Sequence, residues 1–200
     1  MNNLKDVMNF FDTHAPGWDD HTYTAEHKSR IPGIIAGLSL PTGGTVLDVG
    51  SGAGILTPHL RKSLTDSGLI IELDVSMGML QEARKQFSQS NATFIQGAVE
   101  SLPIEDNTVD CAVCFSVFPH FRHHPNALKE LRRVVRSGGY LYVLHLQGSE
   151  ALDACHRSKG GVVKHHKLPG VDRMRKLLVS TGWNPEDIRD SDDEYYVRAI

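Results

Sequence analysis

The chain has 200 residues, a formal net charge of −3, and hydrophobic and charged fractions of 40% and 22%, which are typical of one globular domain. These values exclude disordered, collagen-like and coiled-coil proteins, and the small negative charge gives no general attraction to nucleic acid or to an anionic membrane. Because no apolar run could span a membrane and residues 1–11 hold no unbroken apolar core, we expect neither membrane insertion nor a signal peptide. Three cysteines without scaffold spacing suit a reducing compartment, so we expect a cytoplasmic protein.

The N-terminal segment, residues 1–40, predicts a helical cover. Apolar residues recur at helical spacing in two stretches, residues 4–11 and 27–38. A polar loop at residues 14–20 separates these helices and carries Trp18, and Tyr23 lies just beyond it. Both aromatic residues are candidates for contact with a substrate, and the alternative is that they are ordinary core residues.

The rest of the chain alternates strand patterns with helix patterns. Strands are predicted at residues 45–49, 69–74, 93–96, 109–115 and 140–146, and two more in the tail, residues 185–200. Helices are predicted at residues 56–64, 76–87, 127–135 and 174–182, with Ser76 as an N-cap and Gly138-Gly139 as a stop. This order predicts a single α/β domain, 1–200, with a doubly wound, mostly parallel seven-stranded sheet and an antiparallel C-terminal hairpin.

The first predicted strand runs into a glycine loop, Val46-Leu47-Asp48-Val49-Gly50-Ser51-Gly52-Ala53-Gly54. In such a sheet ligands bind at the carboxyl ends of the strands, and glycines there let the backbone approach them closely. Ile55 breaks the G-x-G-x-x-G spacing of a dinucleotide site. Asp48 would repel a diphosphate but suits a ligand with an ammonium and a sulfonium group, such as S-adenosylmethionine (SAM). Asp74, which ends the second strand, can accept hydrogen bonds from both ribose hydroxyls of an adenosine.

These segments together resemble the class I SAM-dependent methyltransferases. The resemblance runs in family order through residues 46–54, 73–80, 97–103, 107–115 and 128–141. The N-terminal pattern Phe11-Asp12…Ala15…Trp18-Asp19 is similar to that of small bacterial enzymes related to the ubiquinone/menaquinone-biosynthesis methyltransferases. The resemblance implies a Rossmann-like methyltransferase fold, SAM as cofactor, S-adenosylhomocysteine (SAH) as product and a small-molecule acceptor.

The resemblance also implies cofactor contacts for nine residues. They are Asp48, Gly50 and Gly52 at the methionine part, Asp74 at the ribose, Val75, Met79, Val99 and Glu100 around the adenine, and Phe115 beside the sulfonium. Ala98 departs from the family pattern, which has an aspartate there that accepts from the adenine amino group. Either Glu100 or a backbone carbonyl replaces that aspartate, or the adenine is held more weakly.

Eleven histidines is a high number for this length. His120 and His145 follow the fourth strand and end the fifth, so they are candidates for a substrate-side or general-base role, with a solvated or hydrogen-bonded side chain as the alternative. The histidine spacings match no standard ligand pattern, and we expect no metal site. Cys111 and Cys114, three apart in a strand, point to opposite faces and are expected to be core residues.

A basic stretch follows the fifth strand, within residues 147–176, where the resemblance implies a substrate lid. Seven lysines or arginines and one acid lie between residues 155 and 176. This stretch is either a solvated face or a site for an anionic acceptor, which Lys164, His165 or Lys167 would hold.

Other function classes fit the sequence less well. Asp48 and Ile55 disfavour an NAD-type Rossmann oxidoreductase, and the cover and lid disfavour a non-catalytic SAM- or metal-binding module. Phe115-Ser116-Val117-Phe118 at the end of the fourth strand differs from the Asn/Asp-Pro-Pro-Tyr of amino-methylating DNA enzymes, so we expect no nucleic-acid acceptor.

Overall fold

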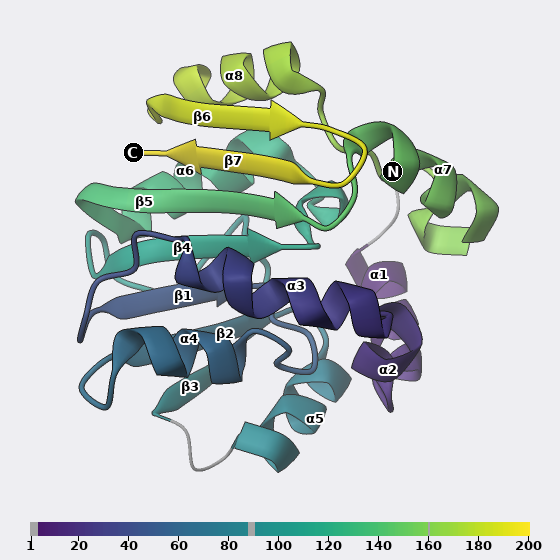
Figure 1. The fold of residues 1–200 in the computed structure, drawn as a ribbon, viewed down its shortest axis with the longest axis horizontal. Coiled ribbons are helices and arrows are strands. Elements are labelled where there is room, and N and C mark those ends of the chain that lie inside the picture. Colours follow the sequence, from purple (N-terminus) through teal and green to yellow (C-terminus); the bar gives the residue numbers. More distant parts are fainter. Residues whose placement is uncertain (1–3, 88–90, 160) are drawn as a thin grey trace.

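A computed structural model describes residues 4–87, 91–159 and 161–200. Its seven strands form one sheet in the order β3-β2-β1-β4-β5-β7-β6 (Figure 1). The strands are β1 (Thr45–Val49), β2 (Leu69–Asp74), β3 (Ala92–Gln96), β4 (Val109–Phe115), β5 (Val135–His145), β6 (Pro185–Asp190) and β7 (Tyr195–Ala199). The first five pair in parallel, and β7 pairs antiparallel with both β5 and β6. The prediction of a doubly wound, seven-stranded sheet with an antiparallel C-terminal hairpin is confirmed.

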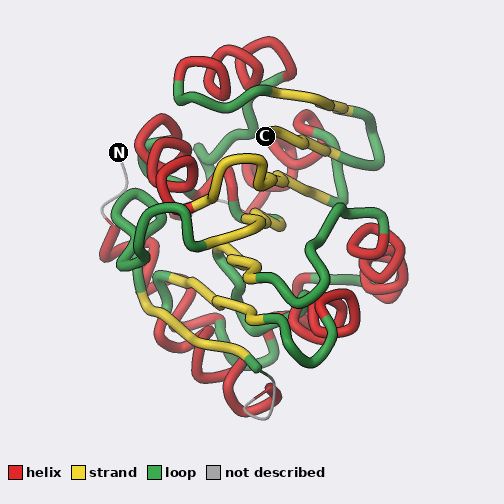
Figure 2. Tube along the Cα trace, turned by 90° about the vertical axis from the view of Figure 1, so that its left-hand side faces the viewer, coloured by secondary structure: helices red, strands yellow, loops and turns green. Residues whose placement is uncertain are grey.

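Helices cover both faces of this sheet, as the side view in Figure 2 shows. They are α1 (Leu4–His14), α2 (Trp18–Thr22), α3 (Ala25–Ala36), α4 (Thr57–Leu64), α5 (Met77–Phe87), α6 (His124–Val134), α7 (Ser149–Lys159) and α8 (Val171–Ser180). Apolar residues of α3 and α4 form one core cluster with one face of the strands, and those of α6 and α8 form another with the opposite face. Cys111 belongs to the first cluster and Cys114 to the second, as their spacing predicted.

Two helices and the start of one strand differ from the prediction. The short helix α2 lies in the stretch predicted as a polar loop, and α7 lies in the stretch predicted only as basic. Neither helix has a long apolar face, so hydrophobic periodicity gave no signal for them. The strand β5 begins at Val135, before the glycine pair, and its pairing with β4 shifts register there. Glycine tolerates such an irregularity without ending the strand.

The N-terminal helix α1 is tied to the start of α5 by one carboxylate. Oδ1 of Asp12 accepts hydrogen bonds from the Ser76 hydroxyl at 2.6 Å and from the Gly78 backbone N–H at 2.9 Å. The Ser76 oxygen in turn accepts from the Met79 N–H at 3.1 Å, as an N-cap does. These bonds hold α1 over the carboxyl ends of the central strands, beside the cavity described below.

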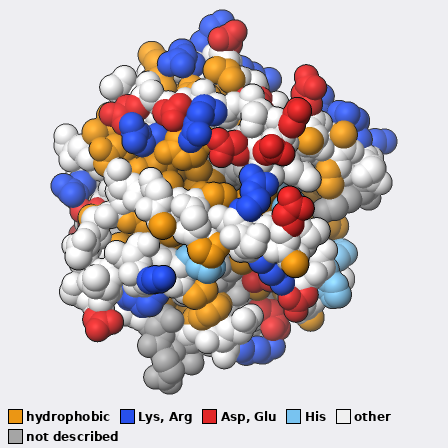
Figure 3. Space-filling model, in the orientation of Figure 1, with side chains coloured by type: hydrophobic (Ala, Val, Ile, Leu, Met, Phe, Trp, Pro, Cys, Tyr) orange, Lys and Arg blue, Asp and Glu red, His pale blue; other side chains and the backbone are white. Residues whose placement is uncertain are grey.

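One face of β5 and β7 carries no helix in Figure 1. Figure 3 shows hydrophobic side chains on this face, among charged ones. The Tyr142 and Tyr196 rings meet there at 6.2 Å, and the Arg189 guanidinium lies 4.2 Å from the centre of the Tyr196 ring. In the part of the chain that is described, no helix has both the length and the apolar character needed to cross a membrane.

Candidate functional site

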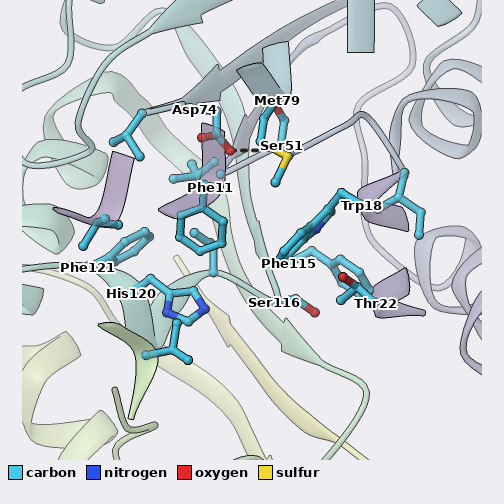
Figure 4. A pocket seen from close by; sticks show the side chains of 18 of the residues that line it. Phe11, Trp18, Thr22, Ser51, Asp74, Met79, Phe115, Ser116, His120 and Phe121 are labelled. Atoms are coloured by element: carbon cyan, nitrogen blue, oxygen red, sulfur yellow. Dashed lines mark hydrogen bonds between the residues drawn. The ribbon is translucent and has the colours of Figure 1, made fainter. Parts of the chain in front are cut away.

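A cavity of about 440 Å³ opens at the carboxyl ends of the parallel strands, near the point where the strand order reverses between β1 and β4. Such a switch point is where ligands bind in doubly wound sheets. All nine residues that the sequence predicted at the cofactor line this cavity, as do Trp18, Tyr23, His120 and His145. Figure 4 shows how α1, the glycine loop and the segment after β4 face one another across it. The roles of these residues there remain predictions.

The glycine loop lies against β2. Its Gly50 and Ser51 N–H groups donate to the Leu73 carbonyl oxygen at 2.7 and 3.0 Å. Gly50 and Gly52 have φ values of 65° and 58°, a left-handed conformation that favours glycine. A Cβ added to Gly50 would lie 2.2 Å from Cγ2 of Val117, so no side chain fits there. The loop is therefore a cradle of bare backbone at the cavity wall.

Asp74 holds this loop from the end of β2. Its Oδ2 accepts from the Gly52 N–H at 3.0 Å, and its Oδ1 accepts from the Ser76 N–H at 2.8 Å. Burial raises the pKa of Asp74 to about 6, although the hydrogen bonds from Ser76 and Gly52 act in the opposite direction. Each carboxylate oxygen can accept more than one hydrogen bond, so Asp74 keeps the capacity to bind ribose hydroxyls from the cavity.

Asp48 is the second buried acid of the site, with 1% of its surface exposed. Burial, followed by the charges of Glu72 and Asp74, raises its pKa well above the usual range. Its Oδ2 has no hydrogen-bond partner among the described residues. A buried carboxylate oxygen without a donor is costly, and a cationic ligand group would satisfy it. This buried acid, beside Gly50 where no Cβ fits, suits the ammonium end of SAM.

The residues predicted around the adenine, Val75, Met79, Val99 and Glu100, all line the cavity. Oε1 of Glu100 accepts from the backbone N–H groups of Arg122 at 2.8 Å and His123 at 3.1 Å. This oxygen is therefore engaged with the loop after η1 (Phe118–His120), and the replacement of the aspartate at position 98 by Glu100 stays a prediction.

Aromatic side chains form the opposite wall. The Phe11 ring of α1 lies 5.5 Å from the rings of both Trp18 and His120 (Figure 4). The Tyr23 ring stacks on Phe115 at 6.0 Å. Phe10 and Phe11 also line the cavity, a role that the sequence analysis missed because their helical spacing indicated only packing. The pattern around Phe11 in the family resemblance was the one signal for it.

Asp19 was likewise missed as a lining residue. Burial raises its pKa to about 6, with the positive charge of Lys28 acting in the opposite direction. Lys28 is paired with the neighbouring Asp20 at 2.6 Å. Asp19 is thus an acid whose protonation changes close to neutral pH at the rim of the cavity.

The histidines form a wall at the far end of the cavity. Burial lowers the pKa of His145 to about 3, so its imidazole is neutral, and its Nε2 has no partner in the described part of the chain. Nδ1 of His120 lies 2.7 Å from Nδ1 of His166, and Nδ1 of His156 lies 2.8 Å from the His166 carbonyl oxygen. Over the described ranges, no group of three or more histidine, cysteine, aspartate or glutamate side chains could hold a metal ion.

The residues of the basic stretch that line the cavity are not the ones that were predicted to contact an acceptor. Leu152, Cys155, His156 and Val163 line it. Lys164, His165 and Lys167 are exposed and are absent from the cavity wall, and Lys167 Nζ lies 4.0 Å from Asp153 Oδ2. The sequence pattern located the segment but not the direction of its charged side chains, so the expected contact of these three residues with an acceptor has no geometric support.

Comparison with known proteins places the central part of the chain in one family. A profile of the methyltransferase domain matches residues 47–143. The chain is 35% identical over 106 residues to the ubiquinone/menaquinone biosynthesis C-methyltransferase UbiE of Hahella chejuensis. The aligned segment covers 51% of this chain and 43% of that protein. It is 32% identical over 142 residues to UbiE of an Enterobacter species, covering 66% of this chain and 53% of that protein.

The fold has counterparts among solved structures. A SAM-dependent methyltransferase from Aquifex aeolicus matches it with a TM-score of 0.74 at 23% identity, over 94% of this chain and 97% of that one. At this identity the likeness concerns the fold alone. The chain spans about half the length, or less, of the curated relatives that it matches.

Proposed function

We propose that this chain is a class I SAM-dependent methyltransferase that transfers a methyl group from SAM to a small-molecule acceptor. The observation that carries the proposal is the cavity at the strand ends, where the glycine cradle and two buried acids, Asp48 and Asp74, meet. We propose further that this reaction takes place in the cytoplasm and that nucleic acid is not the acceptor.

The chain's own residues would bind and orient the cofactor. Asp48 offers a carboxylate to an ammonium group, and Asp74 offers acceptors to ribose hydroxyls. The apolar side chains of Val75, Met79 and Val99 offer surface to an adenine ring. When bound, SAM would supply an activated methyl group to an acceptor held in line with it.

The protein therefore needs mainly to align the two partners and to exclude water. The Phe10, Phe11 and Trp18 side chains form an apolar cover suited to excluding water. A general base is needed only if the attacking atom carries a proton. For that role Asp19 and His120 are better suited than His145, whose low pKa makes it a poor proton acceptor near neutral pH.

Two measurements test the proposal. Isothermal titration with SAM and SAH should give dissociation constants in the micromolar range, whereas NAD should not bind. A screen with methyl-labelled SAM over phenols, quinone precursors, carboxylates and metalloid compounds should reveal an acceptor. Binding without turnover on any acceptor would favour a non-catalytic SAM-binding module, and binding of NAD in place of SAM would favour an oxidoreductase.

Restoring the family aspartate at position 98 should tighten cofactor binding. We expect Ala98→Asp to lower the dissociation constant of SAM about fivefold, since one added hydrogen bond contributes roughly 1 kcal/mol. Ala98→Asn, which can accept the same bond without the charge, is the matched control. If both variants bind SAM as the parent does, Glu100 or a backbone carbonyl already satisfies the adenine amino group.

The charge of the acceptor can be tested with the exposed lysines. Since Lys164 and Lys167 do not line the cavity, we expect the double change Lys164→Gln, Lys167→Gln to leave the KM of the acceptor unchanged within about twofold. Steady-state kinetics at two ionic strengths would check this. A raised KM that no longer varies with salt would instead support an anionic acceptor held by the basic stretch.

A further inference from the structure

A second carboxyl group lies behind Asp48, in the neighbouring strand. Asp48 of β1 is paired in register with Glu72 of β2. Asp48 is 1% exposed and Glu72 is fully buried. Glu72 does not line the cavity, so it meets a ligand only through Asp48 and the glycine loop. Two acids at adjacent positions in the buried centre of a sheet require an explanation, because each ionised carboxylate there loses its hydration.

The contacts of Glu72 leave one side of it without a donor. Its Oε1 accepts from the Thr57 hydroxyl at 2.8 Å. Among the described residues, no donor meets hydrogen-bond geometry with its Oε2 or with Oδ2 of Asp48, although the Ser51 hydroxyl lies close enough to Glu72 to lower its pKa. Carboxylates only accept hydrogen bonds, so the two acids can bond to each other only when one of them carries a proton. Glu72 acts on Asp48 both through its charge and through such a bond.

The surrounding titratable groups supply no positive charge to this pair. Asp74 on β2 acts on both acids and raises the pKa of each. Cys114 on β4 and Tyr23 after α2 also lie close to Asp48, and burial raises the pKa of both, so they are neutral. Of the described residues that act on Asp48 or Glu72, none is basic. A positive charge therefore comes either from a proton or from a ligand.

We propose that Asp48 and Glu72 share one proton in the free protein, and that the ammonium group of SAM or SAH takes its place when the cofactor binds. In this scheme Glu72 is a positioning residue that links cofactor binding to the release of one proton to solvent. The inference rests on the proposed function, because it assigns the ammonium end of the cofactor to Asp48. Charge balances: one proton leaves the pair as one ammonium group arrives.

The direction of the pH effect follows from this exchange. Burial and the neighbouring acids raise the pKa values of both Asp48 and Glu72, so near neutral pH the pair still holds a proton that the ligand has to displace. Affinity for a ligand with an ammonium group should therefore rise with pH and level off once the pair is ionised. Below that point a one-proton exchange changes the dissociation constant by up to about tenfold per pH unit.

A comparison of two ligands distinguishes proton release by the Asp48–Glu72 pair from titration of the other acids of the site. SAH carries the ammonium group, whereas 5′-methylthioadenosine has the same adenosine without the amino-acid part. Any titration of Asp74 at the ribose affects both ligands alike. We expect calorimetry near pH 6, in buffers of different ionisation enthalpy, to show that SAH releases up to about one proton more than 5′-methylthioadenosine. Equal release by the two ligands in the unmodified protein would overturn the inference.

The variant Glu72→Gln tests the partner directly. Its amide has the shape of a protonated glutamate, keeps an acceptor for Thr57 and cannot lose a proton. We expect it to abolish the extra proton release and to make the ratio of SAH to 5′-methylthioadenosine affinity independent of pH. Glu105→Gln, at an exposed position, should behave as the parent.

The possible results are distinguishable. Extra proton release that persists in Glu72→Gln contradicts the role of Glu72. If that variant fails to fold, the comparison of the two ligands on the unmodified protein decides alone. If neither ligand binds at any pH, the proposed function fails and the inference with it, whereas pH-independent binding of SAH defeats only the inference.

Discussion

Asp74→Ala should weaken SAH binding by about 2–4 kcal/mol, roughly 30- to 1000-fold, because hydrogen bonds from the ribose to a charged acceptor are lost. The carboxylate also accepts from the Gly52 and Ser76 N–H groups, so its removal loosens the glycine loop as well. Titration calorimetry with SAH measures the loss. An unchanged dissociation constant would remove Asp74 from the ribose site.

Asp74→Asn is the control for the geometry of the loop. Its side-chain oxygen can still accept from the Ser76 N–H, while the charge and the second acceptor are gone. We expect an intermediate loss of affinity, with a melting temperature nearer the parent than that of Asp74→Ala. If Asp74→Asn bound SAH as weakly as Asp74→Ala, charge rather than loop geometry would explain the whole effect.

Gly50→Ala should abolish measurable cofactor binding. The left-handed φ of 65° costs an L-residue about 1–2 kcal/mol, and the added Cβ would lie 2.2 Å from Cγ2 of Val117. Either the cradle or the segment after β4 has to move, and both line the cavity. We expect thermal unfolding to show about 2–4 kcal/mol of lost stability, since strain and overpacking act together.

Gly138→Ala separates the cost of the left-handed backbone conformation from the cost of the clash with Val117. Gly138 has a similar φ of 77°, but an added Cβ meets nothing within 4 Å. It should lose only the cost of the backbone conformation and bind SAH as the parent does. Val117→Gly combined with Gly50→Ala should recover part of the binding, because it removes both methyl groups and the Cβ, at 2.7 Å, that the added Cβ would meet. Normal SAH binding by Gly50→Ala alone would contradict the tight fit of the cradle.

The sheet could be predicted because each of its strands and covering helices has its own hydrophobic pattern in a short stretch of sequence. Each central strand is buried on both faces and so forms an apolar run, and each is followed by a helix pattern of different period. The two helices that were missed, α2 and α7, have too little apolar surface to give that period. The cofactor residues could be located because strand ends and glycines mark the same edge of the sheet.

Other features of the site depend on relations between distant residues. Glu72 looks like an interruption of an apolar strand until the register of β1 and β2 places it beside Asp48. Phe11 becomes a wall of the cavity only because Asp12 anchors α1 on α5. The lysines of the basic stretch are clustered in sequence, yet the fold turns them to solvent, and a charge pattern carries no information on that direction.

The two hydrogen bonds of Asp12 also bear on how fast a bound cofactor can leave. We expect cofactor exchange to require α1 to lift from α5, and breaking both bonds at the carboxylate costs on the order of 3 kcal/mol. With such a cost, on the order of one molecule in a hundred is in the opened form. The dissociation rate of SAH then depends on how often α1 opens, and not only on the contacts between SAH and the cavity. We expect product exchange, not methyl transfer, to limit the rate on a good acceptor.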